Sequence, residues 1–208
     1  MNRDSTNTRP QSILSACDYD GDVRRRVVDM KYRGRRSLAR ELARHLAHTV
    51  RSDVGDTIEL VTWAPTSAKR RRRRGFDQAQ LIARFVAREL GVPCRRLLVR
   101  ETRHAQTGRS RAARLAGPRF RALSTRRPLR VLVVDDVVTT GSTLRAAAHA
   151  LTASGWGDVT LAAVAATPSG RPAPRPNVLI RPRSHEPQHS HRRGQIPTSD
   201  RTRSMAGC

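Results

Sequence analysis

Apolar residues recur along this chain with two different spacings, and each spacing predicts one kind of element. Over residues 19–48 the apolar positions repeat every three to four residues, which is typical of helices with one buried face, and Gly34 suggests a break between them. The same spacing predicts a helix over residues 78–90, which Asp77 caps and Gly91 ends.

Between the helical segments lie runs of aliphatic residues that do not alternate with polar ones. The clearest run covers residues 131–134, and we expect further strands at 58–62, 97–99 and 159–165. An unbroken aliphatic run indicates a strand that is covered on both faces, as in a parallel sheet. Strands that alternate with helices, including one expected over 144–153, predict an α/β fold with a mainly parallel sheet flanked by helices.

The two ends of the chain differ from this central pattern. Residues 1–18 are mostly polar, and we expect them to form a flexible N-terminus. Residues 169–208 hold six of the twelve prolines together with many arginines and few apolar residues, so we expect a disordered basic tail. The predicted domain therefore covers residues 19–168.

Charge changes this picture more than any other property of the composition. The 41 basic and 17 acidic residues give a formal net charge of +24, while aromatic residues make up only 3%. Such a surplus attracts polyanions, which include phosphate-rich small molecules and nucleic acid, although an arginine-rich composition alone also produces it. The scarcity of aromatic residues leaves no evident platform on which bases could stack.

Two absences in the sequence bear on location. No run of about 18 apolar residues is present that could span a membrane, and the first residues lack the apolar core of a signal peptide. Cys17, Cys94 and Cys208 are scattered and lack the spacing of zinc ligands. We therefore expect a cytoplasmic protein in a reducing environment.

The candidate chemistry lies in residues 131–143, where the strand is followed by two acids and a small polar loop. The loop precedes a helix, whose N-terminus offers unpaired N–H groups and a partial positive charge that suit a phosphate. Asp135 and Asp136 stand at the carboxyl end of the strand, where they could accept hydrogen bonds from a sugar diol or bind Mg²⁺ shared with the ligand. The ligand expected is a phosphorylated sugar, and the alternative is a capped turn without a ligand. The loop consists of Thr139, Thr140, Gly141, Ser142 and Thr143.

All thirteen positions of this segment resemble the motif with which type I phosphoribosyltransferases bind 5-phosphoribosyl-1-pyrophosphate (PRPP). The resemblance implies a type I phosphoribosyltransferase-like fold, in which Asp135 and Asp136 contact the ribose hydroxyls and residues 139–143 bind the 5′-phosphate. In that fold a loop after the first core strand holds the pyrophosphate. Here the basic run that contains Lys69 and Arg74 and ends at Gly75 takes that place.

Three further segments narrow the resemblance to the ComF-type (ComF/GntX-like) family, named for a bacterial DNA-uptake protein. Residues 19–34 are similar to its N-terminal helix ending in Lys-Tyr-x-Gly, and residues 74–78 to its Arg-Gly-Phe-Asn-Gln signature, with Asp77 in place of Asn. The chain lacks the four-cysteine module of many members, and its polar loop carries Arg109 and Gly117 where the family has Leu and Asn. Three polar residues of that loop match the family spacing: Gln106, Ser110 and Arg114.

The resemblance implies a transferase that binds PRPP with Mg²⁺, passes phosphoribosyl to an acceptor and releases pyrophosphate. We assign no catalytic residue and no direct metal ligand, and residues 101–120 are the candidate for a loop that closes over the site. The acceptor stays unknown, although Thr139 stands where enzymes of 6-oxopurine salvage keep an aspartate. Two alternatives remain open: a non-catalytic, competence-related protein that binds single-stranded DNA, and a regulator that senses PRPP. A homodimer is left open as well.

Overall fold

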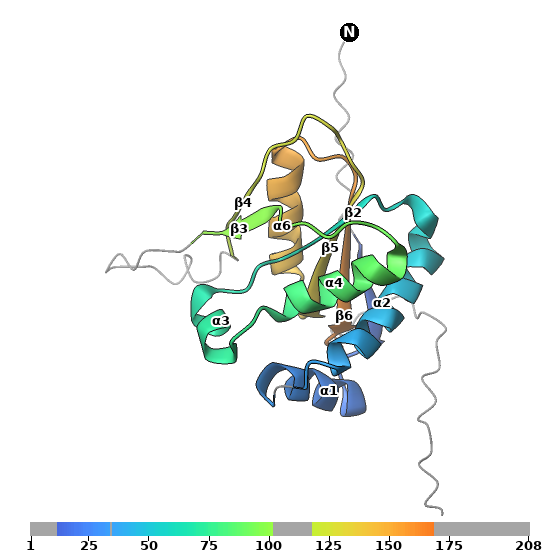
Figure 1. Cartoon of the computed structure of the whole chain (residues 1–208), viewed down its shortest axis with the longest axis vertical. Coiled ribbons are helices and arrows are strands. Elements are labelled where there is room, and N and C mark those ends of the chain that lie inside the picture. The colour runs from blue at the N-terminus through green and yellow to red at the C-terminus, as the bar shows by residue number, and fades with distance from the viewer. Residues whose placement is uncertain (1–11, 34, 102–117, 169–208) are drawn as a thin grey trace, which may run out of the picture. The chain divides into compact units, whose positions relative to one another are not determined.

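The structure is a computed structural model, and it describes residues 12–33, 35–101 and 118–168. Its centre is a four-stranded parallel sheet in the order β1-β6-β5-β2 (Figure 1). The four strands are β1 (Ile13–Asp18), β2 (Leu60–Trp63), β5 (Val131–Val138) and β6 (Val159–Ala166). Because helices connect and flank these strands, the predicted α/β class with a mainly parallel sheet is confirmed.

Side chains alternate along each central strand between two hydrophobic cores. On β5, Leu132 and Val134 point to one core, and Val131 and Val133 point to the other. Helices α2 (Leu38–Val54) and α4 (Gln78–Leu90) cover the first face, and α6 (Ser142–Ala153) covers the second (Figure 1). The four residues 131–134 are all buried, which is why this run shows no polar alternation.

Helix α4 has the bounds that the sequence predicts. The Asp77 side chain accepts a hydrogen bond from the backbone N–H of Gln80, and the helix ends at Gly91, whose φ is 74°. A carboxylate that satisfies a free N–H and a glycine that takes the left-handed conformation are local signals. They account for where this helix begins and ends. The helical segment of residues 19–48 likewise forms α1 (Gly21–Tyr32) and α2.

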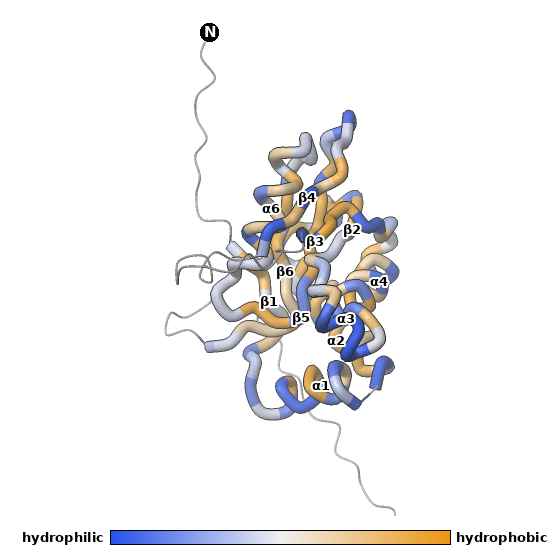
Figure 2. Tube along the Cα trace, turned by 90° about the vertical axis from the view of Figure 1, so that its left-hand side faces the viewer, coloured by the Kyte–Doolittle hydropathy of each residue, from blue (hydrophilic) through white to orange (hydrophobic). Residues whose placement is uncertain are grey.

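The basic run of residues 69–74 is helical, and the expectation of a loop was wrong. Helix α3 (Ala68–Arg74) starts where the Ser67 hydroxyl accepts a hydrogen bond from the N–H of Arg70, and it ends at Gly75, whose φ is 77°. Arginine is a good helix former, and the two caps satisfy backbone groups at both ends of this short helix. None of its residues is buried, so no apolar spacing reveals it. Figure 2 shows it as a hydrophilic segment.

The prediction of a flexible segment over residues 1–18 was wrong for residues 13–18. These form β1, an edge strand whose backbone pairs with β6, for example Ile13 with Leu161 and Cys17 with Ala165. The strand is half-buried and mixes apolar residues with Ser15 and Cys17, so its pattern in the sequence is weak. Residues 1–11 and the predicted tail at 169–208 lie outside the described residues.

A small antiparallel pair lies beside the main sheet. Strand β3 (Leu98–Arg100) confirms the strand expected near residues 97–99, whereas β4 (Phe120–Ala122) falls in a stretch that the sequence suggests is merely polar. The predicted loop residues Gln106, Ser110 and Arg114 fall between them, outside the described residues. A short 3₁₀ turn (Gly55–Thr57) lies between α2 and β2. No helix among the described residues is long and apolar enough to cross a membrane.

Candidate functional site

The candidate site lies at the carboxyl ends of the neighbouring strands β2 and β5. The chain leaving β2 leads through α3 to α4 on one face of the sheet, and the chain leaving β5 leads to α6 on the other face. Connections that part in this way open a crevice between the two strand ends, which is where open α/β sheets bind ligands. A cavity of about 150 Å³ lies there, and Asp135 and Asp136 are among its lining residues. We call it the acid cavity.

The two acids are oriented by the backbone of their own strand. Oδ1 of Asp135 accepts a hydrogen bond of 2.8 Å from the N–H of Asp136, and Oδ1 of Asp136 accepts one of 2.7 Å from the N–H of Val137. The second carboxylate oxygen of Asp136 lies 2.7 Å from Nζ of Lys31, at the end of α1. Both side chains of this ion pair are shielded, with exposures of 14% and 15%. The sequence analysis assigns no role in the site to Lys31.

Burial raises the pKa of Asp135 to about 8, and the neighbouring carboxylate of Asp136 adds to the effect. A third acid, Asp77, also lines the acid cavity, and burial raises its pKa as well. Hydrogen bonds from the backbone N–H groups of Thr66 and Gln80 act in the opposite direction on Asp77. The site thus holds three acids close together, and it favours ligands that bring hydroxyl donors or positive charge.

The hydroxyl-rich loop adjoins the acid cavity. A second cavity, of about 210 Å³, is lined by Asp135 and by residues 137–144, which include all five loop residues named from the sequence. Asp135, Val137 and Thr143 line both cavities, so the acids and the loop lie next to each other. Gly141 has a φ of 75°, and a Cβ atom at this position would lie 2.5 Å from Cδ1 of Ile13. Only glycine therefore fits this turn without a shift in its neighbours.

Arg145, in the first turn of α6 beside this loop, is a basic residue that the sequence motif does not include. Its Nη1 donates a hydrogen bond of 2.6 Å to the carbonyl oxygen of Thr140, which places a positive charge beside the start of α6. The Thr140 hydroxyl in turn donates to the Ser142 hydroxyl. A guanidinium and a helix N-terminus both favour a negatively charged group. Its position one turn into the helix after Gly141 is the signal that could have pointed to it.

The three residues predicted to hold pyrophosphate lie in different places. Arg74 lines the acid cavity with Arg70, while Lys69 lines a neighbouring cavity of about 530 Å³. Gly75 ends helix α3 and is not among the residues described as lining these cavities. Five arginines, from α3 and from the segments around β3 and β4, line the large cavity: Arg71, Arg72, Arg96, Arg100 and Arg119.

The guanidinium of Arg74 is engaged by neighbouring side chains. It donates to the Tyr32 hydroxyl at 2.8 Å and to Oε1 of Gln78 at 2.7 Å, and it lies 4.9 Å from the centre of the Tyr32 ring. Its Nε atom is buried without a hydrogen-bond partner. Arg74 thus joins α1, α3 and α4 beside the acid cavity. These contacts hold in place the side chain that the sequence analysis favours for binding pyrophosphate.

The residues around the acid cavity do not form a protein-held metal site. Carboxylate oxygens suit Mg²⁺, but Lys31 already pairs with Asp136. Among the described residues, no group of three or more His, Cys, Asp or Glu side chains is arranged to hold a metal ion. A Mg²⁺ ion in this crevice would therefore need most of its ligands from the bound molecule.

Comparison with known proteins identifies the family. Residues 77–184, just over half of the chain, match the phosphoribosyl transferase domain. The DNA utilization protein YhgH of Salmonella typhimurium is 31% identical over 154 residues, which cover 70% of this chain and 67% of that protein. Competence protein F of Haemophilus influenzae is 34% identical over 116 residues, about half of each chain. The chain therefore belongs to the phosphoribosyltransferase family, and to its ComF-type members, as the sequence predicts.

A solved structure is also similar. The glutamine PRPP amidotransferase from B. subtilis matches with a TM-score of 0.45 and 20% sequence identity. The match covers 66% of this chain and only 30% of that one.

Proposed function

We propose that this protein binds PRPP in the crevice between β2 and β5 and transfers its phosphoribosyl group to an acceptor, with release of pyrophosphate. The observation that carries the proposal is the shared cavity lining, in which Asp135 joins the acid pair to the hydroxyl loop. An acid pair alone or a phosphate loop alone has many uses. Side by side, they suit one ligand that has both a sugar diol and a phosphate.

The roles of the residues follow from their chemistry. The 5′-phosphate would bind at residues 139–143, where α6 begins and Arg145 adds positive charge. The ribose hydroxyls would donate to Asp135 and Asp136. The pyrophosphate would lie toward α3, where Arg70 and Arg74 line the acid cavity.

In the transfer step, the bond between ribose C1 and the pyrophosphate oxygen breaks, and its electron pair leaves with pyrophosphate. A lone pair of the acceptor forms the new bond to C1. Guanidinium groups near α3 would stabilise the charge that grows on the leaving group, and no nucleophile of the protein is needed. Mg²⁺ would enter with PRPP as the counter-ion of its phosphates.

Ligand-induced stabilisation tests PRPP binding directly. We expect PRPP with Mg²⁺ to raise the Tm of the wild type and not that of Asp135→Asn/Asp136→Asn, because a ligand stabilises only a protein that binds it. Absence of a shift in the wild type at saturating ligand would refute both the transferase and the PRPP-sensing regulator. If PRPP binds, pyrophosphate release across a panel of acceptors then separates these two functions.

A second candidate function is binding of single-stranded DNA. The similar proteins carry the names DNA utilization protein and competence protein F. Helix α3 presents exposed arginines beside Tyr32, whose side chain is 54% exposed, so a stacking residue and phosphate-binding charges lie together. This function predicts an affinity for oligonucleotides that falls steeply with salt and does not depend on Asp135 or Asp136. Fluorescence anisotropy with the wild type and the double Asn variant measures both properties.

A further inference from the structure

We propose that Lys31 is a specificity residue of the acid cavity: its ammonium group occupies the position on Asp136 that a free divalent cation would otherwise take, so that a cation enters only together with the phosphorylated sugar. The second clause rests on the proposed function. The first concerns the protein without ligand and can be tested by itself.

The geometry of the ion pair supports this role. Nζ of Lys31 lies 2.7 Å from Oδ2 of Asp136, while Oδ1 of the same carboxylate is held by the N–H of Val137. Both oxygens of Asp136 are therefore engaged. A metal ion arriving without other ligands would have to displace the ammonium group from a shielded position, where the attraction between the charges is stronger than in water.

The surrounding charges make a counter-ion necessary. Three acids line the acid cavity, two from β5 and Asp77 just before α4. Repulsion between the neighbouring carboxylates helps to hold a proton on Asp135 and leaves Asp136 as the carboxylate that pairs with a cation. Facing them are Lys31 from α1, Arg70 and Arg74 from α3, and Arg100 from β3. Arg74 donates to Tyr32 and Gln78, so its direction is fixed by those contacts, whereas Lys31 is directed onto the acid pair itself.

The residue type is informative because this chain uses arginine almost everywhere. Only two of its 41 basic residues are lysines, Lys31 and Lys69. A lysine ammonium is a compact point charge, unlike the wide planar fork of arginine, so it fits a site of the size of a single cation. A preference for arginine caused by overall composition does not explain a lysine here.

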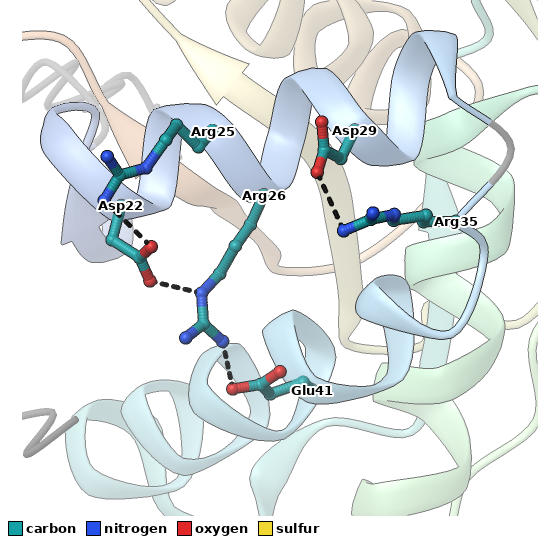
Figure 3. Close-up of polar contacts among 6 residues, drawn as sticks. All are labelled: Asp22, Arg25, Arg26, Asp29, Arg35 and Glu41. Carbon is teal, nitrogen blue, oxygen red and sulfur yellow. Dashed lines mark hydrogen bonds and ion pairs between the residues drawn. The ribbon is translucent and has the colours of Figure 1, made fainter. Parts of the chain in front are cut away.

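Helix α1 is fixed in a way that keeps Lys31 in place. Val27 and Met30, on the same helix, are fully buried in the core. Arg26 of α1 pairs with Asp22, near the start of the same helix, and with Glu41 of α2 (Figure 3). At its end, Asp29 accepts a hydrogen bond from Arg35, which closes the turn into α2 (Figure 3). The ammonium group is thus delivered by an anchored helix rather than by a loose side chain on the surface.

The test measures binding of Mn²⁺ alone, which electron paramagnetic resonance detects directly. We expect Lys31→Met to bind Mn²⁺ at least about tenfold more tightly than the wild type, which should bind little at the same concentration. The reason is that the variant leaves the acid pair without its counter-ion. Arg40→Met is the control, since it removes one positive charge from an exposed position of α2 outside the acid cavity, and it should behave like the wild type. The double variant Lys31→Met/Asp136→Asn should lose the gain.

Each outcome decides the proposal. Tight binding of Mn²⁺ to the wild type would overturn it, and this arm needs no folded variant. Equal binding to the wild type and to a folded Lys31→Met would overturn it too; Lys31→Gln replaces the Met variant if that one unfolds. PRPP with Mg²⁺ is tested on the wild type in parallel. Its failure would contradict the proposed function, whereas a wild type that binds PRPP together with an unchanged Lys31→Met would contradict this inference alone.

Discussion

The acid pair and helix α3 line the same crevice but are built in opposite ways. Asp135 and Asp136 extend from the central strand β5, which is buried between two cores and paired on both sides. Helix α3 has no buried residue, and capping hydrogen bonds and contacts with Tyr32 hold it. In the proposed function, the acid pair on its buried strand (the rigid part) would select a ligand by geometry, and helix α3 (the exposed part) would attract it by charge.

The largest effect is expected when the acid pair loses its carboxylates. Asp135→Asn/Asp136→Asn should weaken PRPP binding by about tenfold to a hundredfold, because a hydrogen bond to the ion-paired carboxylate of Asp136 contributes about 1.5–3 kcal/mol. Isothermal titration calorimetry measures the change. Replacing two exposed arginines of α3, Arg71 and Arg72, by Gln should cost about tenfold at most and mainly at low salt. If the arginine variant lost more affinity than the double Asn variant, the contrast between the acid pair and α3 would be wrong.

The pKa of Asp135 gives the second effect. Because folding raises this pKa from 3.8 to about 8, the folded protein holds a proton that the unfolded chain has lost. The contribution of Asp135 to stability is therefore fully present below about pH 4 and is lost as pH rises toward 8, by up to about 1.4 kcal/mol per pH unit.

Urea denaturation at several pH values checks this. The free energy of unfolding of Asp135→Asn, relative to that of the wild type, should increase steadily from pH 5 to pH 8. Groups shared by both proteins, such as the histidines, cancel in this difference. A difference that stays flat with pH would show that burial does not hold the proton on Asp135.

The third effect concerns the loop that joins strand and helix. Gly141→Ala should lower the free energy of unfolding by about 1–3 kcal/mol, because a left-handed backbone opposes it and the ends of the Ile13 and Arg145 side chains must move away from the added Cβ atom. Gly91→Ala is the matched control, since its φ of 74° is similar and no atom lies within 4 Å of the added Cβ. It should cost only about 1 kcal/mol. The difference between the two variants in chemical denaturation gives the cost of the close contact at residue 141. Equal losses would show that this contact costs nothing.

The smallest effect is expected in the exposed part. Arg74→Ala removes hydrogen bonds to Tyr32 and Gln78 and should cost about 1 kcal/mol, whereas Arg72→Ala should change stability by less than about 0.5 kcal/mol. Thermal denaturation of both variants measures the difference. If the two variants were equally stable, the contacts of Arg74 would not contribute to holding α3.

Elements with local signals could be read from the sequence. Helix α4 is bounded by its own cap and its own glycine, and β5 is an aliphatic run that needs no partner to be recognised. The acid pair and the hydroxyl loop follow that run directly, so they were found together. Helix α3 and strand β1 were missed because neither has an apolar spacing. One is too exposed to need it, and the other depends on the neighbouring strand β6.

The sequence by itself determined the α/β class, the family, and the acid pair and loop that we propose bind a phosphorylated sugar, because each depends on residues that are neighbours in the chain. Only the tertiary structure decided what surrounds those residues. Lys31, Arg74 and Asp77 meet the acid pair because α1, α3 and α4 come together at the ends of β2 and β5. Ion pairing and burial depend on distances in space, and no local pattern records which distant side chain will supply the counter-charge.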